Sequence, residues 1–167
     1  MRVLVTSSRN TFALDAIRKL GSTDHTVVAS DTYAGAVGSH SKYLEAHEVT
    51  ASPRFETDAF IDDINRIVEK YDIDVILPTF EEAFYLAARR ADLADGVRLY
   101  AGNFDKLARL HDKASFQRLV AEAGVPVPAG VWACSPMPDH SPERWRRATA
   151  TPRPTSPGWF SRSSTAR

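Results

Sequence analysis

Cysteine and long apolar runs are both scarce in this sequence of 167 residues. A single cysteine, Cys134, cannot form an internal disulfide and is typical of a protein in a reducing compartment. No apolar run is long enough to span a bilayer, and the apolar start of the chain is too short for a signal peptide. We therefore expect a cytoplasmic protein with no membrane partner.

Several sequence patterns of catalysis and cofactor binding are also missing. The five histidines show no spacing for zinc, and there is no G-x-S-x-G sequence for a nucleophilic serine. No G-x-G-x-x-G sequence is present, so a dinucleotide would lack the close backbone approach that these glycines allow. Zinc chemistry, nucleophilic catalysis and ordinary dinucleotide binding therefore have no support in the sequence.

The net charge of the whole chain is zero, but its two parts carry opposite net charges. Residues 1–131 contain 15 lysine and arginine residues against 19 acidic ones, whereas residues 132–167 contain 6 arginines against 2 acids. The first part therefore has a net charge of −4 and the second of +4. The total of zero gives no indication of a nucleic-acid partner, and RWRR at 144–147 is too short to predict one.

Strand-like and helix-like segments alternate over the first 101 residues. Helices are predicted where apolar residues recur at helical spacing: one ended by Gly21, one capped by Thr57, and one with a stripe from Phe80 to Ala91. This alternation is typical of an α/β fold with a doubly wound, mainly parallel, Rossmann-like sheet, to which we assign residues 1–102. The predicted strands lie at 2–6, 26–30, 46–50, 74–78 and 97–101.

Two short helices and a segment of different composition follow. Asn103 or Asp105 can cap the first helix, and Asp112 can cap the second, which Gly124 would end. We interpret residues 103–131 as linker helices. Residues 132–167 hold six of the ten prolines and show no periodicity, which predicts a disordered or non-native tail.

A polar turn follows the first predicted strand and precedes the first predicted helix. Ligands of doubly wound folds bind at this place, since the free N–H groups of a helix start attract anions. The side chains of Ser7, Ser8, Arg9 and Asn10 could add further donors. The alternative is a plain polar turn in which Asn10 or Thr11 caps the helix.

Acidic residues stand at two later strand ends. Asp31 closes the second predicted strand, where an acid in a dinucleotide fold holds a ribose hydroxyl, although a turn aspartate explains it equally well. Glu81 and Glu82 follow the strand at 74–78 and begin a helix. One of these glutamates could face the crevice and bind a substrate amine, whereas the helix dipole alone would also favour acids there.

Lys113 lies in the first turn of the last predicted helix. The helix dipole disfavours a cation there by about 0.3–1 kcal/mol. A bound anion would reverse this effect, because the backbone N–H groups and the ammonium would both face it. Alternatively, Lys113 is a solvated residue whose charge Asp112 offsets.

The order of these segments resembles the ATP-grasp superfamily. LARLHDKASFQRLVAEAGVPVP is similar to the segment that joins the N-terminal domain of ATP-grasp enzymes to their ATP-binding domains, with the family's pattern at Asp112, Lys113, Gly124, Val125, Pro126 and Pro128. MRVLVTSSRNTFALDAIRKL and IDVILPTFEEAFYLA resemble the preATP-grasp domain of carbamoyl-phosphate-synthase-like carboxylate–amine ligases. The resemblance covers about residues 1–130.

The resemblance implies a function and a set of site residues. Family members join a carboxylate to an amine (or a thiol) through an acylphosphate, with ATP and Mg²⁺ as cofactors and small-molecule substrates as partners. Lys113 would contact the nucleotide phosphates. The loop from Ser7 to Asn10, with Asp31, Glu81 and Glu82, would lie on the substrate side. A homodimer is left open as the assembly.

The tail departs from the family pattern. No lysine follows Lys113, and the family's metal-binding acids have no counterpart, so we expect the chain as given to be an inactive N-terminal fragment. The abrupt change of composition near Val131 suggests a frameshift or a truncation, which sequencing the DNA past codon 131 would test. Two alternatives stay open: a stand-alone Rossmann-like module that binds a nucleotide or small ligand, and an interaction protein whose basic tail docks a partner.

Overall fold

The computed structural model describes residues 1–127, and its centre is a five-stranded sheet. All strand pairs are parallel, and the strand order is β3-β2-β1-β4-β5. This confirms the predicted doubly wound α/β fold and adds the strand order, which sequence periodicity does not give. The strands are β1 (Arg2–Val5), β2 (Thr26–Asp31), β3 (Leu44–Val49), β4 (Val75–Leu77) and β5 (Arg98–Leu99).

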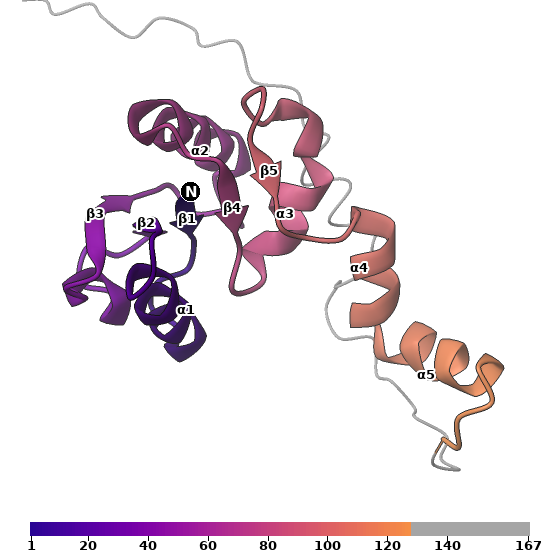
Figure 1. Cartoon of the computed structure of the whole chain (residues 1–167). Helices are drawn as coiled ribbons and strands as arrows, with labels where there is room; N and C mark the ends of the chain where they lie inside the picture. The colour runs from indigo at the N-terminus through magenta and orange to yellow at the C-terminus, as the bar shows by residue number, and fades with distance from the viewer. Residues whose placement is uncertain (128–167) are drawn as a thin grey trace, which may run out of the picture.

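Helices cover both faces of this sheet, so its central strands are apolar on both sides (Figure 1). Leu4 and Val28 pack on one face with α2 and α3, while Val3 and Val27 alternate with them and pack on the other face with α1. Complete burial of such a side chain contributes about 1.5–3 kcal/mol. The helices are α1 (Thr11–Gly21), α2 (Thr57–Tyr71), α3 (Glu82–Ala88), α4 (Phe104–His111) and α5 (Lys113–Glu122), with 3₁₀ turns at Val37–His40 and Arg90–Asp92.

Three helix boundaries differ from the predictions. Gly21 is the last residue of α1 and not a residue beyond its end. A Cβ atom on Gly21 would lie 2.6 Å from the Cβ of Tyr43, so close packing is what requires glycine here. Thr57 begins α2 instead of capping it, and its hydroxyl donates to the carbonyl of Pro53 at 2.8 Å. The helix expected from Phe80 to Ala91 is shorter, because α3 occupies only seven residues.

Helices α4 and α5 begin after predicted capping residues. The side chain of Asn103 accepts a hydrogen bond from the Lys106 N–H at 3.0 Å, and Asp112 accepts one from the Ser115 N–H at 2.7 Å. Gly124 follows α5 with a φ of 76°, in the left-handed region that suits glycine. Because α4 packs on α3 and α5 packs on α4, the pair leads away from the sheet (Figure 1).

The end of the predicted linker and the whole predicted tail lie outside the described residues, so both stay predictions. In the part of the chain that the structure describes, no helix has the length and apolar character that a membrane crossing requires.

Candidate functional site

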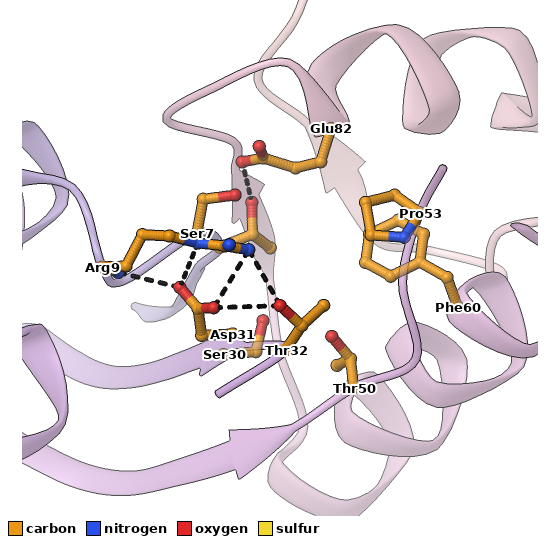
Figure 2. Close-up of a pocket in the computed structure, with 10 residues that line it drawn as sticks. Ser7, Arg9, Ser30, Asp31, Thr32, Thr50, Pro53, Phe60 and Glu82 are labelled. Atoms are coloured by element: carbon orange, nitrogen blue, oxygen red, sulfur yellow. Dashed lines mark hydrogen bonds and ion pairs between the residues drawn. The ribbon is translucent and has the colours of Figure 1, made fainter. Parts of the chain in front are cut away.

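The carboxyl ends of the strands meet where the chain changes its direction of travel across the sheet. The chain passes from central β1 to β2 and β3 on one side, and then returns to β4 and β5 on the other. Ligands of open α/β sheets bind at such a switch point. A pocket lies here, lined by Thr6, Ser7, Arg9, Ser30, Asp31, Thr32, Thr50, Pro53, Phe60 and Glu82 (Figure 2).

The pocket has a polar wall and an apolar wall. Figure 2 shows Arg9, Asp31 and Glu82 grouped with hydroxyl side chains, and Pro53 and Phe60 facing them from the other side. The cavity between the walls measures only about 10 Å³, which is room for about one water molecule. A larger ligand must therefore bind at the rim or enter after side chains move.

Asp31 and Arg9 form an ion pair at the polar wall. The Asp31 side chain is completely buried, and its Oδ2 accepts hydrogen bonds from the Arg9 backbone N–H at 2.8 Å and from the Arg9 Nε at 3.2 Å. The guanidinium also donates to the Thr32 hydroxyl at 2.9 Å and stacks on the ring of Tyr33, whose centroid lies 4.8 Å away. Asp31 therefore anchors the β1–α1 loop, and protein groups already engage both its oxygens.

The β1–α1 loop turns through an unusual conformation at Ser7. Its φ of 54° is uncommon for a residue other than glycine. The Ser7 carbonyl accepts hydrogen bonds from the Asn10 backbone N–H at 3.1 Å and from the Asn10 side chain at 3.3 Å. Asn10 occupies the N-cap position of α1, but its side chain makes no capping hydrogen bond. Its amide therefore holds the loop, not the helix start.

Ser8 holds the loop in place through its hydrogen bonds and does not line the pocket. It is fully buried, and its N–H donates to the carbonyl of Ser30 at 3.1 Å. Its hydroxyl lies 2.9 Å from the Nε2 of His47, on β3. Burial lowers the pKa of His47, although the nearby carboxylates of Asp31 and Glu48 act in the opposite direction. His47 is therefore suited to a neutral hydrogen-bonding role at this position.

Glu82 brings the end of β4 into the site. Its Oε1 accepts hydrogen bonds from the Thr6 hydroxyl at 2.6 Å and from the backbone N–H groups of Thr79 at 2.9 Å and Phe80 at 3.2 Å. Its Oε2 is buried and has no hydrogen-bond partner within residues 1–127. A buried polar atom left unsatisfied costs about 1–3 kcal/mol, and more when charged. A ligand group that donates a hydrogen bond to Oε2 would therefore satisfy this atom.

The structure brings some of the predicted site residues together and separates others. Ser7, Arg9, Asp31 and Glu82 line the pocket, and Ser8 and Asn10 shape its loop. Glu81 is exposed and does not line the pocket. Lys113 is the exposed first residue of α5, which lies at the far end of the described chain from α1 (Figure 1).

Sequence reasoning missed three residues that hold the site in place. Thr6 directly follows β1, and its position at a strand end was a usable signal. Thr79 joins two strand ends, because its hydroxyl donates to the Thr6 carbonyl at 2.7 Å. His47 gave no signal, since its contact with Ser8 depends on the placement of β3.

The described residues do not fit a magnesium site. Within residues 1–127, no three histidine, cysteine, aspartate or glutamate side chains converge as metal ligands.

Comparison with known proteins places this fold among larger enzymes. No protein-family model and no curated protein matches the sequence. The biotin carboxylase subunit of pyruvate carboxylase matches 75% of the chain at 21% identity with a TM-score of 0.54. L-amino acid ligase from Bacillus licheniformis matches 76% of the chain at 15% identity with a TM-score of 0.55. The biotin carboxylase domain of 2-oxoglutarate carboxylase from Hydrogenobacter thermophilus matches 75% of the chain at 20% identity with a TM-score of 0.52. That structure is a dimer in complex with MgADP, ADP and bicarbonate.

The chain covers 28%, 31% and 28% of these three proteins, respectively, so it spans under a third of their length. At these identities the likeness establishes the fold. The chain shares its α/β fold with a part of these biotin carboxylases and of the L-amino acid ligase.

Proposed function

We propose that this chain is the N-terminal, substrate-side part of an ATP-dependent ligase that joins a carboxylate to an amine. The observation that carries this proposal is the unpartnered Oε2 of Glu82 at the switch point of a fold shared with ATP-grasp enzymes. In such a reaction the γ-phosphoryl group of ATP passes to the carboxylate, which leaves an acylphosphate and ADP. The amine then attacks the acyl carbon, and phosphate leaves.

The chemistry of the pocket favours an amine over an anion. Its charged groups are the carboxylates of Asp31 and Glu82 and the guanidinium of Arg9, and the guanidinium is already paired with Asp31. Because the charges of Arg9 and Asp31 balance, the pocket keeps one formal negative charge, which belongs to Glu82. An ammonium group would donate to Oε2 and supply the missing hydrogen bond. We therefore assign the amine substrate to the polar wall beside Glu82.

Lys113 is the proposed contact for the nucleotide phosphates. It is exposed at the first turn of α5, where free N–H groups and its ammonium would attract the same anion. The other ligands of ATP and Mg²⁺ would have to come from outside residues 1–127. We therefore expect the chain as given to bind ATP weakly and to lack the complete reaction.

The amine assignment is tested by titrating the full chain with a panel of free amino acids and simple primary amines. We expect shifts of the Thr79 and Phe80 amide NMR signals, because both N–H groups bond the same carboxylate. Glu82→Gln should abolish the shifts, whereas Glu81→Gln, a change at the exposed neighbour, should leave them unchanged. Equal shifts in the two variants, or no shifts at all, would refute the assignment.

The nucleotide assignment is tested separately by calorimetry with ATP and magnesium. We expect weak binding that Lys113→Ala removes and that Lys106→Ala, at an exposed lysine of α4, preserves. Micromolar affinity that is unaffected by Lys113→Ala would refute this role.

A stand-alone module that binds a small ligand is the second candidate. It is favoured by the position of the pocket, whose lining ends at Glu82, so that no downstream segment is needed to form it. Translation of the DNA past codon 131 separates the two candidates. A frame that encodes a further lysine-bearing strand and acidic metal ligands supports the ligase, and its absence supports the binding module.

A further inference from the structure

Three exposed aromatic side chains lie in the loops next to the pocket. Tyr33, Phe55 and Phe80 are 61%, 80% and 58% exposed. They follow β2, β3 and β4, respectively, and because these strands are parallel, the loops after them lie at the same edge of the sheet as the pocket. We call these three side chains the aromatic rim. Each is within two positions of a residue that lines the pocket, namely Thr32, Pro53 and Glu82.

The aromatic rim borders both walls of the pocket. On the polar side, the guanidinium carbon of Arg9 lies 4.8 Å from the centroid of the Tyr33 ring. The backbone N–H of Phe80 donates to Oε1 of Glu82 at 3.2 Å, which fixes Phe80 next to this carboxylate. On the other side, Phe55 follows Pro53 of the apolar wall by two positions (Figure 2).

The core of the protein does not account for these aromatic residues. Within residues 1–127, two clusters of buried apolar side chains form the core, and no member of the aromatic rim belongs to either cluster or packs against it. A single exposed aromatic side chain is ordinary at a protein surface, whereas several that share one edge with a pocket indicate a binding surface.

The size of the cavity divides an amine ligand into two parts. The cavity of about 10 Å³ has room for one group of the size of water, and an ammonium group is of this size. In the proposed function, this ammonium donates to the unpartnered Oε2 of Glu82. All other atoms of the ligand must then lie outside the cavity, where the aromatic rim is the neighbouring surface.

We propose that the amine substrate carries an aromatic or large apolar body, which packs on the aromatic rim while its ammonium binds Glu82. The inference rests on the proposed function, because it uses the same amine contact. An aromatic ring on the ligand would remove apolar surface of the rim from water and pair with its rings. A hydroxylated body, such as that of an amino sugar, would gain neither contribution.

Three probes titrated into the full chain test this inference. Methylamine has the ammonium without the body, 2-phenylethanol has the body without the ammonium, and 2-phenylethylamine has both. The Thr79 amide NMR signal is the readout, since this N–H donates to Glu82 at 2.9 Å. We expect 2-phenylethylamine to bind at least about tenfold more tightly than either of the other two probes.

Substitutions in the aromatic rim test which side chains receive the body. Phe80→Ala and Phe55→Ala should each weaken the binding of 2-phenylethylamine about two- to tenfold and leave that of methylamine unchanged. Both side chains are more than half exposed, so the fold should tolerate their loss. Phe116→Ala, at a phenylalanine of α5 that is 47% exposed, is the matched control and should leave every affinity unchanged.

The outcomes distinguish this inference from the proposed function. Equal affinities of methylamine and 2-phenylethylamine, both lost in Glu82→Gln, would overturn the apolar body and leave the amine contact in place. Equal affinities of 2-phenylethanol and 2-phenylethylamine would overturn the amine contact, and with it both proposals. Absence of binding by all three probes would do the same. An equal loss in Phe116→Ala and Phe80→Ala would overturn the role of the aromatic rim.

Discussion

The carboxylate of Asp31 and the backbone N–H of Arg9 lie 2.8 Å apart, and this contact joins the end of β2 to the loop after β1. The same carboxylate also pairs with the guanidinium of Arg9, which is 43% exposed, while the Asp31 side chain has no exposure at all. A completely buried carboxylate is thus stabilised from one side by backbone donors and from the other by a half-exposed cation.

Removal of this cation should destabilise the fold. Arg9→Ala leaves Asp31 buried with its backbone donors but without its countercharge. Breaking a fully buried pair costs about 3–5 kcal/mol, and since Arg9 is partly solvated we expect about 1–2 kcal/mol. Urea unfolding would measure this loss. Arg54→Ala, at an exposed arginine that stacks on Phe55, is the control and should stay within about 0.5 kcal/mol of the parent. Equal stability of both variants would contradict a structural role for the pair.

Gly21→Ala should also destabilise, against the usual preference for alanine in helices. Alanine is favoured over glycine in a helix interior by about 1 kcal/mol. At Gly21 the new Cβ would meet the Cβ of Tyr43 at 2.6 Å, and such overpacking costs about 1–3 kcal/mol. Gly35→Ala is the control, because nothing lies within 4 Å of its added Cβ. Thermal unfolding of the two variants should therefore differ, and a stabilised Gly21→Ala would show that Tyr43 does not pack on the end of α1 as described.

Acidic pH should lower the stability of the fold through protonation of Glu48. Hydrogen bonds from Lys70, Tyr71 and Arg66 lower the pKa of this carboxyl to about 2 from its ordinary value of 4.5. A carboxyl whose pKa is lower in the folded state stabilises the fold above its unfolded pKa, and this contribution is lost as the pH falls from about 4.5 towards 2. In urea unfolding at several pH values, Glu48→Gln should show a smaller loss of stability over this window than the parent. Parallel profiles would contradict the network.

The fold was predictable from the sequence because its signals are local. Val3 to Val5 and Val27 to Ala29 are buried, and their short apolar runs were sufficient to predict both segments as strands. Asn103 and Asp112 cap helices through residues only three positions away, which is within the range of sequence patterns. The role of Gly21 could not be predicted, because it depends on Tyr43, a residue 22 positions later that packs against the end of α1.

The site was predictable in part for the same reason. Ser7, Arg9 and Glu82 follow strand ends and Asp31 is the last residue of β2, and parallel strands bring such residues to one edge. The contacts of the site residues could not be predicted from the sequence. The hydrogen bond between Ser8 and His47 depends on the strand order. Which of Glu81 and Glu82 is buried depends on where α3 starts. Strand ends thus locate a site, while tertiary contacts decide which of its groups stay open to a ligand.

Ser7 offers a test that separates stability from function. Ser7 and Asp72 are the non-glycine residues with positive φ among residues 1–127, at 54° and 50°. Asp72 is the C-cap of α2, where glycine is preferred, so Asp72→Gly should stabilise the fold by about 0.5–1 kcal/mol. Ser7→Gly should stabilise it similarly by relieving the same strain.

The two substitutions should then differ in ligand binding. Ser7 lines the pocket and Asp72 does not, so Ser7→Gly should weaken the binding of amines seen in the NMR titration, whereas Asp72→Gly should leave it unchanged. Strain that is retained at a pocket residue, although one substitution would remove it, indicates that the side chain serves the ligand. If Ser7→Gly stabilises the fold and binds amines as well as the parent does, the Ser7 hydroxyl has no part in the site, and the proposed amine contact is left to Glu82.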